Sequence, residues 1–255
     1  METIKTKYNN GDMYAGEILN GLRHGKGVYI HAGGDKYHGY WQHGKKNGKG
    51  IFTFSDGCVY KGLWKNDDPN GRGSYTFKSG SVYEGYFQDG KQHGLGVHRF
   101  TNGDAYQGDW QKGLPHGKGR YTYANGNRYE GDWKTGMQTG RGAHFYAHGD
   151  KYEGHWLDDK RHGKGVLYYG SGGGYDGGWS EDKWHGLGTY QHASGERYYG
   201  DWREGKKHGK GYYFYYDGSR FEGTWQNNKI HGKGTFFTAD GSREAREYVN
   251  DERVK

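Results

Sequence analysis

The chain has 255 residues and a formal net charge of +7, and it is 31% hydrophobic but 18% aromatic, with 52 glycines. Because globular domains usually contain about 45–50% apolar residues, this composition excludes a thick aliphatic core, although rings could still cover a thin sheet. The single cysteine, Cys58, excludes an internal disulfide and favours a cytoplasmic location, and no apolar run approaches the roughly 20 residues of a membrane-spanning helix.

The chain begins with METIKTKYNN, residues 1–10, which lacks the apolar stretch of a secretory signal. Tyr8 precedes Tyr14 by six residues, the same interval that separates Phe54 from Tyr60 later in the chain. We therefore expect residues 1–10 to form a half-repeat strand that covers the N-terminal edge of the repeats that follow.

A period of 23 residues, without insertion or deletion, then runs through residues 11–243. If the aromatic residue of each copy is position 0, glycine occupies positions +2, +11, +13 and +20 in all ten copies, and Trp occupies +4 in eight. These four columns hold 40 of the 52 glycines, so the glycine content is architectural. Position 0 is occupied in turn by Tyr14, Tyr37, Tyr60, Tyr83, Tyr106, Tyr129, Tyr152, Tyr175, Tyr198 and Phe221.

Alternation within each copy predicts two short strands. Tyr129, Gly131 and Trp133 would point to one face, a turn at KTGM would join the strands, and AHGD would lead to the next copy. A hairpin centred between +8 and +9 would place 0 opposite +17, +2 opposite +15, and +4 opposite +13. In that register each Trp lies between glycines, and each ring at +15 lies beside the glycine at +2. Because glycine has no side chain, these rings have more room than one strand spacing of about 4.8 Å would give them.

The predicted fold is therefore all-β: an elongated, single-layer, twisted antiparallel β-meander of about 20 short strands. One copy buries too little to fold alone, so neighbours must stabilise each other. After residue 243 the pattern breaks, with Glu244 where Tyr is due. Residues 244–255 are interpreted as a charged C-terminal cap or tail, either an edge strand or one to three turns of helix.

The strings RYEGDWKTG and RYYGDWREGKKHGKGYYFYYDGS resemble MORN repeats (membrane occupation and recognition nexus) across residues 11–243. The resemblance implies an array of β-hairpins, while its implications for function are broader because these repeats serve several unrelated roles. Radial-spoke head proteins of cilia and flagella contain runs of such repeats, as do other cytoskeletal proteins. The resemblance thus suggests a structural protein of the cytoskeleton, in the axoneme of a cilium or flagellum.

The sequence contains no strong motif for metal binding, phosphate binding or catalysis. Seven histidines at position +10, among them His116 and His162, lie two strands apart, about 9–10 Å, which is too far for one metal ion. YYGSGGGYDGG, residues 168–178, lacks the Lys-Ser/Thr of a phosphate-binding loop. We expect no catalytic residues, no metal, no cofactor and no enzymatic activity.

The first candidate binding surface is the aromatic face, where an extended peptide or a helix of another protein could lie along the rings. Such a face could also support homo-oligomers. Its candidate residues are Trp41, Trp64, Trp110, Trp133, Trp156, Trp179, Trp202, Trp225, Tyr75, Tyr121 and Tyr213.

The second candidate surface is a basic long edge at positions +8 to +12, opposite an edge with several Asp residues. It would attract an acidic protein partner or, as an alternative function, the acidic phosphoinositides of a membrane to which the chain binds peripherally. Nucleic acid is the least favoured partner of this edge, because the aromatic rings pack within the sheet. The candidate residues are Lys45, Lys46, Lys160, Arg161, Lys206 and Lys207.

Overall fold

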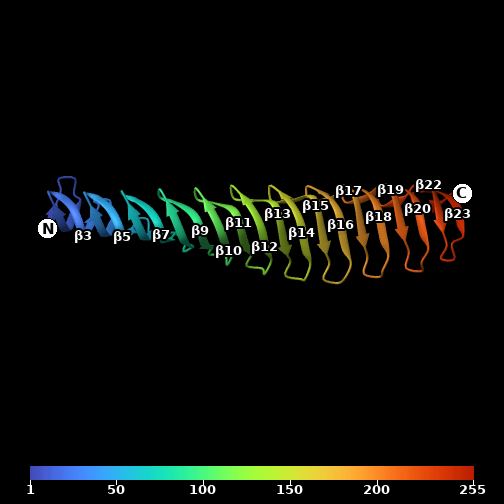
Figure 1. The fold of residues 1–255 in the computed structure, drawn as a ribbon, viewed down its shortest axis with the longest axis horizontal. Helices are drawn as coiled ribbons and strands as arrows, with labels where there is room; N and C mark the ends of the chain where they lie inside the picture. Colours follow the sequence, from blue (N-terminus) through green and yellow to red (C-terminus); the bar gives the residue numbers. More distant parts are fainter. The chain divides into compact units, whose positions relative to one another are not determined.

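The computed structural model describes residues 1–255, which form 24 β-strands and no helix. It therefore contains no helix that could cross a membrane. The chain divides into two compact units, one made of Met1–Ala124 with Trp133–Gly136 and the other of Asn125–Asp132 with Met137–Lys255. In each unit, successive strands pair antiparallel as a meander of hairpins (Figure 1). The predicted all-β meander is confirmed, with 24 strands where about 20 were expected.

In the first unit, each strand pairs with the next from β1 to β11. The strands are β1 (Glu2–Lys7), β2 (Met13–Leu19), β3 (Leu22–Ile30), β4 (Lys36–Gln42), β5 (Lys45–Thr53), β6 (Val59–Lys65), β7 (Asp68–Thr76), β8 (Val82–Gln88), β9 (Lys91–Arg99), β10 (Ala105–Gln111) and β11 (Leu114–Thr122). The next strand, β12 (Arg128–Lys134), contributes residues to both units.

The second unit continues the same hairpin pattern, except that its tenth repeat has a divided second strand. The strands are β13 (Met137–Phe145), β14 (Lys151–Leu157), β15 (Lys160–Tyr168), β16 (Gly174–Ser180), β17 (Lys183–Gln191), β18 (Arg197–Arg203), β19 (Lys206–Phe214), β20 (Arg220–Gln226), β21 (Lys229–Ile230), β22 (Gly232–Phe237), β23 (Arg243–Val249) and β24 (Glu252–Arg253).

The hairpin turns lie within the predicted segments KTGM and AHGD, although the first is centred between +6 and +7 and not between +8 and +9. In KTGM, Thr135 and Gly136 both have positive φ, 48° and 86°, as expected for a type I′ turn, whose twist matches that of paired strands. The equivalent pair is left-handed in every other repeat, and Asn250 and Asp251 after the tenth repeat continue the series. The second loop, AHGD, turns at Gly149, with φ of 104°.

The predicted register of the strands is wrong. Position 0 faces +15, not +17, and the glycine at +2 faces the glycine at +13; in β14 and β15, Tyr152 pairs with Leu167 and Gly154 with Gly165. The hairpin is centred between +6 and +7, and a β-bulge after +2 shifts the pairing. The glycine at +11 is left-handed in all ten copies, as in Gly163 with φ of 63°, and lets the second strand absorb this bulge.

Each position-0 ring lies on the pair of glycines at +2 and +13 of its own repeat. A Cβ added to Gly154 or Gly165 would overlap the Tyr152 side chain. The position-0 rings are 0–1% exposed, and they are the largest fully buried side chains of the chain. The idea that glycine makes room for rings is therefore correct, but the ring belongs to position 0 and not to +15.

The position-0 hydroxyl satisfies the backbone of the bulge. Tyr152 Oη donates to the carbonyl oxygen of His155 at 3.0 Å, and the other eight position-0 tyrosines make the same bond. A partly buried carbonyl beside the bulge thus has a donor, as buried backbone groups require.

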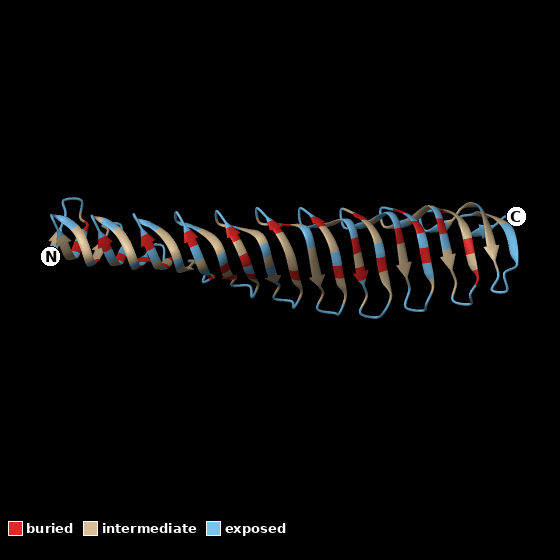
Figure 2. Ribbon diagram, in the orientation of Figure 1, coloured by how far each residue is buried: buried red, intermediate tan, exposed pale blue.

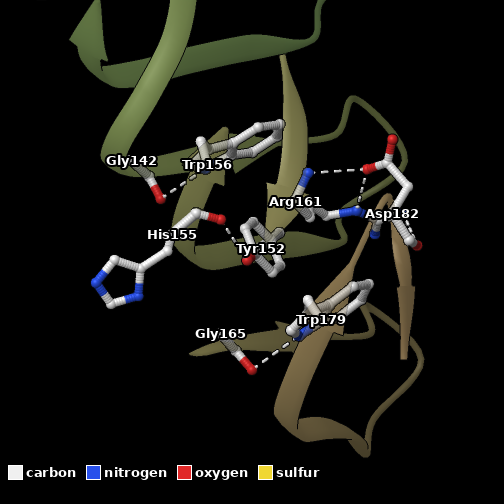
Figure 3. A network of polar contacts seen from close by, with 8 residues as sticks. All are labelled: Gly142, Tyr152, His155, Trp156, Arg161, Gly165, Trp179 and Asp182. Atoms are coloured by element: carbon white, nitrogen blue, oxygen red, sulfur yellow. Dashed lines mark hydrogen bonds and ion pairs between the residues drawn. The ribbon is translucent and has the colours of Figure 1, made fainter. Parts of the chain in front are cut away.

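The Trp at +4 connects consecutive repeats, as Figure 3 shows for Trp156 and Trp179. Tyr152 contacts both indoles edge to face, with ring centroids 5.3 Å and 5.0 Å apart, an arrangement that aromatic pairs prefer. Trp156 Nε1 also donates to the carbonyl oxygen of Gly142 at 3.2 Å. Buried residues therefore recur at the same places in successive strands (Figure 2).

Both ends of the chain are strands. In β1, Ile4 and Thr6 pair with Gly16 and Tyr14, as positions +13 and +15 do elsewhere. At the other end, residues after 243 form β23 and β24 rather than a helix. Tyr248 occupies the Trp position and contacts the Phe221 ring at 5.4 Å.

The substitution Gly142→Val tests the ring–glycine packing. A side chain at Gly142 would overlap the Tyr129 ring, and we expect overpacking to lower the free energy of unfolding by about 1–3 kcal/mol. Urea unfolding measures this, with Gly33→Ala as control because its Cβ would meet no atom within 4 Å. Equal midpoints for the two variants would contradict the packing.

The substitution Tyr152→Phe tests the hydroxyl. It leaves the His155 carbonyl without its donor, so the free energy of unfolding should fall by about 1–3 kcal/mol. The control is Tyr168→Phe, since Tyr168 is 48% exposed. If both variants unfold at the same urea concentration, the bond does not stabilise the bulge.

Candidate functional site

The eight Trp residues predicted for the partner-binding face form the core of the repeats. Each of their side chains is only 4–6% exposed. The eight residues are Trp41, Trp64, Trp110, Trp133, Trp156, Trp179, Trp202 and Trp225. The indoles are enclosed by position-0 rings and by the next strand. They present little area to another molecule, so the neighbouring side chains must supply most of any contact surface on this face.

The predicted tyrosines at +15, Tyr75, Tyr121 and Tyr213, are half-buried. Tyr121 and Tyr213 contact Trp133 and Trp225, whereas Tyr75 contacts Phe54 and Phe77. The Tyr121 hydroxyl donates to Asp104 Oδ2 at 2.7 Å. Burial raises the pKa of all three phenols above the usual value, so they remain neutral donors.

Sequence reasoning missed the column at +17, which alternates with +15 to form an unbroken row of rings in the first unit. Consecutive centroids are 4.2–6.3 Å apart. Eight of these ten side chains are half-buried and two are buried. We call this set the ring row; its members are Tyr29, His31, Phe52, Phe54, Tyr75, Phe77, His98, Phe100, Tyr121 and Tyr123.

The middle of the ring row is apolar and uncharged. His98 stacks between Phe77 and Phe100, with centroids 5.2 Å and 4.2 Å away, and burial lowers its pKa. In the second unit the row is interrupted, because Leu167 occupies +15 in the seventh repeat. The recurrence of aromatic residues at +17, visible in the sequence, was the signal that could have revealed this surface.

Half of the predicted basic edge lies on the aromatic face. Lys46, Arg161 and Lys207, all at +9, place their cationic groups 4.5, 4.4 and 4.6 Å from the indoles of the next repeat. Burial lowers the pKa of Lys46 and of Lys207. The hairpin turn at +6 and +7 points these side chains across the rings, where cation–π attraction holds them.

The other half, at +8, is exposed at the hairpin tips: Lys45, Lys160 and Lys206. In the second unit the tips are joined by ion pairs from one hairpin to the next. Lys160 pairs with Glu181, and Arg161 Nε lies 2.9 Å from Asp182 Oδ1 (Figure 3). These acids, absent from the predicted site, neutralise part of the basic edge.

The opposite edge uses its carboxylates to hold loops together. Asp104 Oδ1 accepts the Ala124 N–H at 2.8 Å, and Asp35 and Asp150 accept the equivalent amides of Ser55 and Gly170. The hydrogen bond from Tyr121, together with that from Ala124, lowers the pKa of Asp104. No three His, Cys, Asp or Glu side chains come together as metal ligands would.

This geometry agrees with the comparison to family models. A model described as the MORN repeat matches ten consecutive segments: residues 14–36, 37–59, 60–82, 83–105, 106–128, 129–151, 152–174, 175–197, 198–220 and 221–243. The chain belongs to the MORN-repeat family. The family model begins each MORN repeat at the position-0 aromatic, and no other domain is found in the chain.

Comparisons with individual proteins give only distant likenesses to this MORN-repeat chain. No curated protein matches it. It is similar to the TCP10 domain of Danio rerio CPAP, solved with a peptide of STIL, with 11% identity, a TM-score of 0.45, and coverage of 97% of this chain and 100% of that one. It is also similar to the TCP domain of Drosophila melanogaster SAS-4, solved with a proline-rich motif of Ana2, with 12% identity, a TM-score of 0.37, and coverage of 67% and 86%.

The substitution Tyr121→Phe should raise the pKa of Asp104 toward its ordinary value of 3.8, because it removes the largest cause of the shift. A depressed carboxyl pKa contributes stability above the unfolded value and loses it as pH falls through the folded value. Carboxyl NMR titration measures the change, with Asp56, whose hydrogen bonds come from Cys58, as the internal reference. An unchanged Asp104 titration would contradict the bond.

Proposed function

We propose that this MORN-repeat chain is a non-catalytic structural scaffold that binds other proteins along the ring row. The observation that carries the proposal is the continuous series of rings from Tyr29 to Tyr123, eight of which are half-exposed. Aromatic side chains lose little conformational entropy on binding and anchor many interfaces. A helix or an extended peptide of the partner would lie along the row.

The backbone holds this row rigidly. At each hairpin tip, the N–H of position +7 donates to the +9 carbonyl of the preceding repeat, as in Gly90 to Pro69 and Gly113 to Gln92. An Asp at +7 also accepts the +9 amide, as Asp67 does from Lys46 at 2.8 Å. A surface fixed at both edges loses little freedom when a partner binds.

A catalytic role finds no support in the chain's organisation. The ten repeats that occupy residues 14–243 belong to a non-catalytic repeat family. We place the scaffold in an axonemal assembly of cilia or flagella, such as the radial spoke. Membership of a family whose runs of repeats occur in radial-spoke head proteins supports this setting.

Co-sedimentation of the purified chain with isolated axonemes tests the proposal. We expect saturable binding that falls at least tenfold in the double variant Phe77→Gln, Phe100→Gln, because both rings lie in the middle of the row. The control is Tyr216→Gln, since Tyr216 is 82% exposed and lies outside the row. Circular dichroism confirms that each variant is folded.

Two outcomes would overturn the proposal. Undiminished axoneme binding by the double variant would remove the ring row as the binding surface. A chain that ignores axonemes but sediments with phosphoinositide vesicles at physiological salt would favour the membrane alternative.

A further inference from the structure

Position +3 varies between repeats: four carry an acid, and the seventh, eighth and tenth carry His155, Gly178 and Thr224. Three consecutive repeats carry a large apolar or aromatic side chain there. In the first, fifth, sixth and ninth repeats this residue is Glu or Asp, and its carboxylate accepts the backbone N–H of position +12. The four bonds join Lys26 to Glu17, Lys118 to Asp109, Arg141 to Asp132 and Lys210 to Asp201, at 2.9–3.0 Å. In the second, third and fourth repeats the residue is Tyr40, Leu63 and Tyr86, which offer no carboxylate.

These three side chains are exposed on the face opposite to the position-0 rings. Their exposed fractions are 43%, 38% and 44%, and the neighbouring Leu95 is 63% exposed. Replacing an acid that caps an amide by an exposed apolar side chain gives up a charge-assisted hydrogen bond. The cationic groups of Lys26 and Arg72 lie 5.8 and 5.6 Å from the ring centroids of Tyr40 and Tyr86, which nevertheless remain exposed.

Basic side chains alternate with the apolar ones across these strands. Lys26 pairs with Tyr40, Lys49 with Leu63, and Arg72 with Tyr86. No ion pair in the structure involves the three cations, all of which are exposed. Glu17 lies beside the Lys26 amide, but no acid at +3 lies beside Lys49 or Arg72, so this strip carries an excess of positive charge. We call the set Lys26, Tyr40, Lys49, Leu63, Arg72, Tyr86 and Leu95 the β3–β9 strip.

We propose that the β3–β9 strip is a second binding surface, and that its partner is an extended acidic protein segment with interspersed apolar residues. Charge complementarity identifies the partner as acidic, and the exposed Tyr and Leu side chains require apolar contacts between its carboxylates. The surface lies on the face opposite to the ring row, so it would bind its partner independently of the proposed scaffold function.

The spacing of the strip defines the partner's period. Successive cations lie on every second strand, so they are about 9.6 Å apart. An extended chain advances about 3.3 Å per residue, so three residues span roughly 9.9 Å. A partner segment with an acidic residue at every third position, and an apolar residue between, would therefore place one carboxylate near each of the three cations.

Fluorescence anisotropy with a labelled 12-residue peptide of repeating Glu-Leu-Ser tests the proposal on the full chain. Peptides of repeating Glu-Ser-Ser and Lys-Leu-Ser are the matched probes. We expect saturable binding of the first, at least tenfold weaker binding of the second, and none of the third. Equal binding of the two acidic peptides would overturn the apolar part of the proposal.

Two protein variants locate the binding. The triple variant Tyr40→Asn, Leu63→Asn, Tyr86→Asn removes the apolar groups but supplies an amide oxygen that can accept the +12 N–H. It should lose at least tenfold in affinity while melting no lower than the parent chain. The triple variant Lys26→Gln, Lys49→Gln, Arg72→Gln should lose a similar factor. Parent-like affinity in either variant would overturn the proposal.

The double variant Phe77→Gln, Phe100→Gln should bind the Glu-Leu-Ser peptide as the parent does, because it alters the other face. Failure of this surface is thereby distinguished from failure of the ring row. If vesicles containing phosphatidylserine bind and the acidic peptide does not, the strip is a membrane surface and the proposal is wrong.

Discussion

The structure depends on a tyrosine ring that lies across two paired glycines. In each repeat the glycines at +2 and +13 face one another and leave no Cβ above the sheet, and the ring at position 0 fills that space. The ring's hydroxyl then pairs with the carbonyl of the bulge, and its edge meets the indoles at +4. The position-0 ring thus fills the space above the glycines, supplies a donor to the bulge carbonyl and contacts the indole of the next repeat.

That arrangement leaves particular positions free for function. The rings at 0 and +4 are fully used in the core, so substitutions there would change stability before they changed recognition. Positions +15 and +17 lie beside the core and remain half-exposed, while +3 and +12 lie on the other face. These positions vary between repeats: +15 is His98 in the fourth and Leu167 in the seventh, and +3 is Leu63 in the third. The invariant columns describe how the family folds, and the variable ones describe how this chain differs.

Much of the fold was predictable, because its signals are local. The period, the two strands per copy, and the turns at Thr135-Gly136 and around Gly149 follow from glycine placement and alternation. The register was not predictable in the same way. It depends on a β-bulge after +2 and on a left-handed glycine at +11, and a two-residue shift keeps the same side chains on the same face.

The candidate site was predicted less completely. Sequence patterns identified the aromatic face, but they could not show that Trp156 is enclosed while Phe77 is accessible, because burial depends on the register. They also placed Lys46 and Arg161 on an edge, whereas the hairpin geometry lays both over indoles. The ion pair of Arg161 with Asp182 joins residues 21 positions apart, and only the pairing of adjacent hairpins brings them together.

Proton NMR of the glycine α protons tests the central contact most directly. A proton beneath an aromatic ring is shielded, so one α proton each of Gly154 and Gly165 should resonate upfield of ordinary β-strand glycine, and Tyr152→Leu should abolish both shifts. Unshifted α protons at these glycines in the folded parent chain would contradict the account.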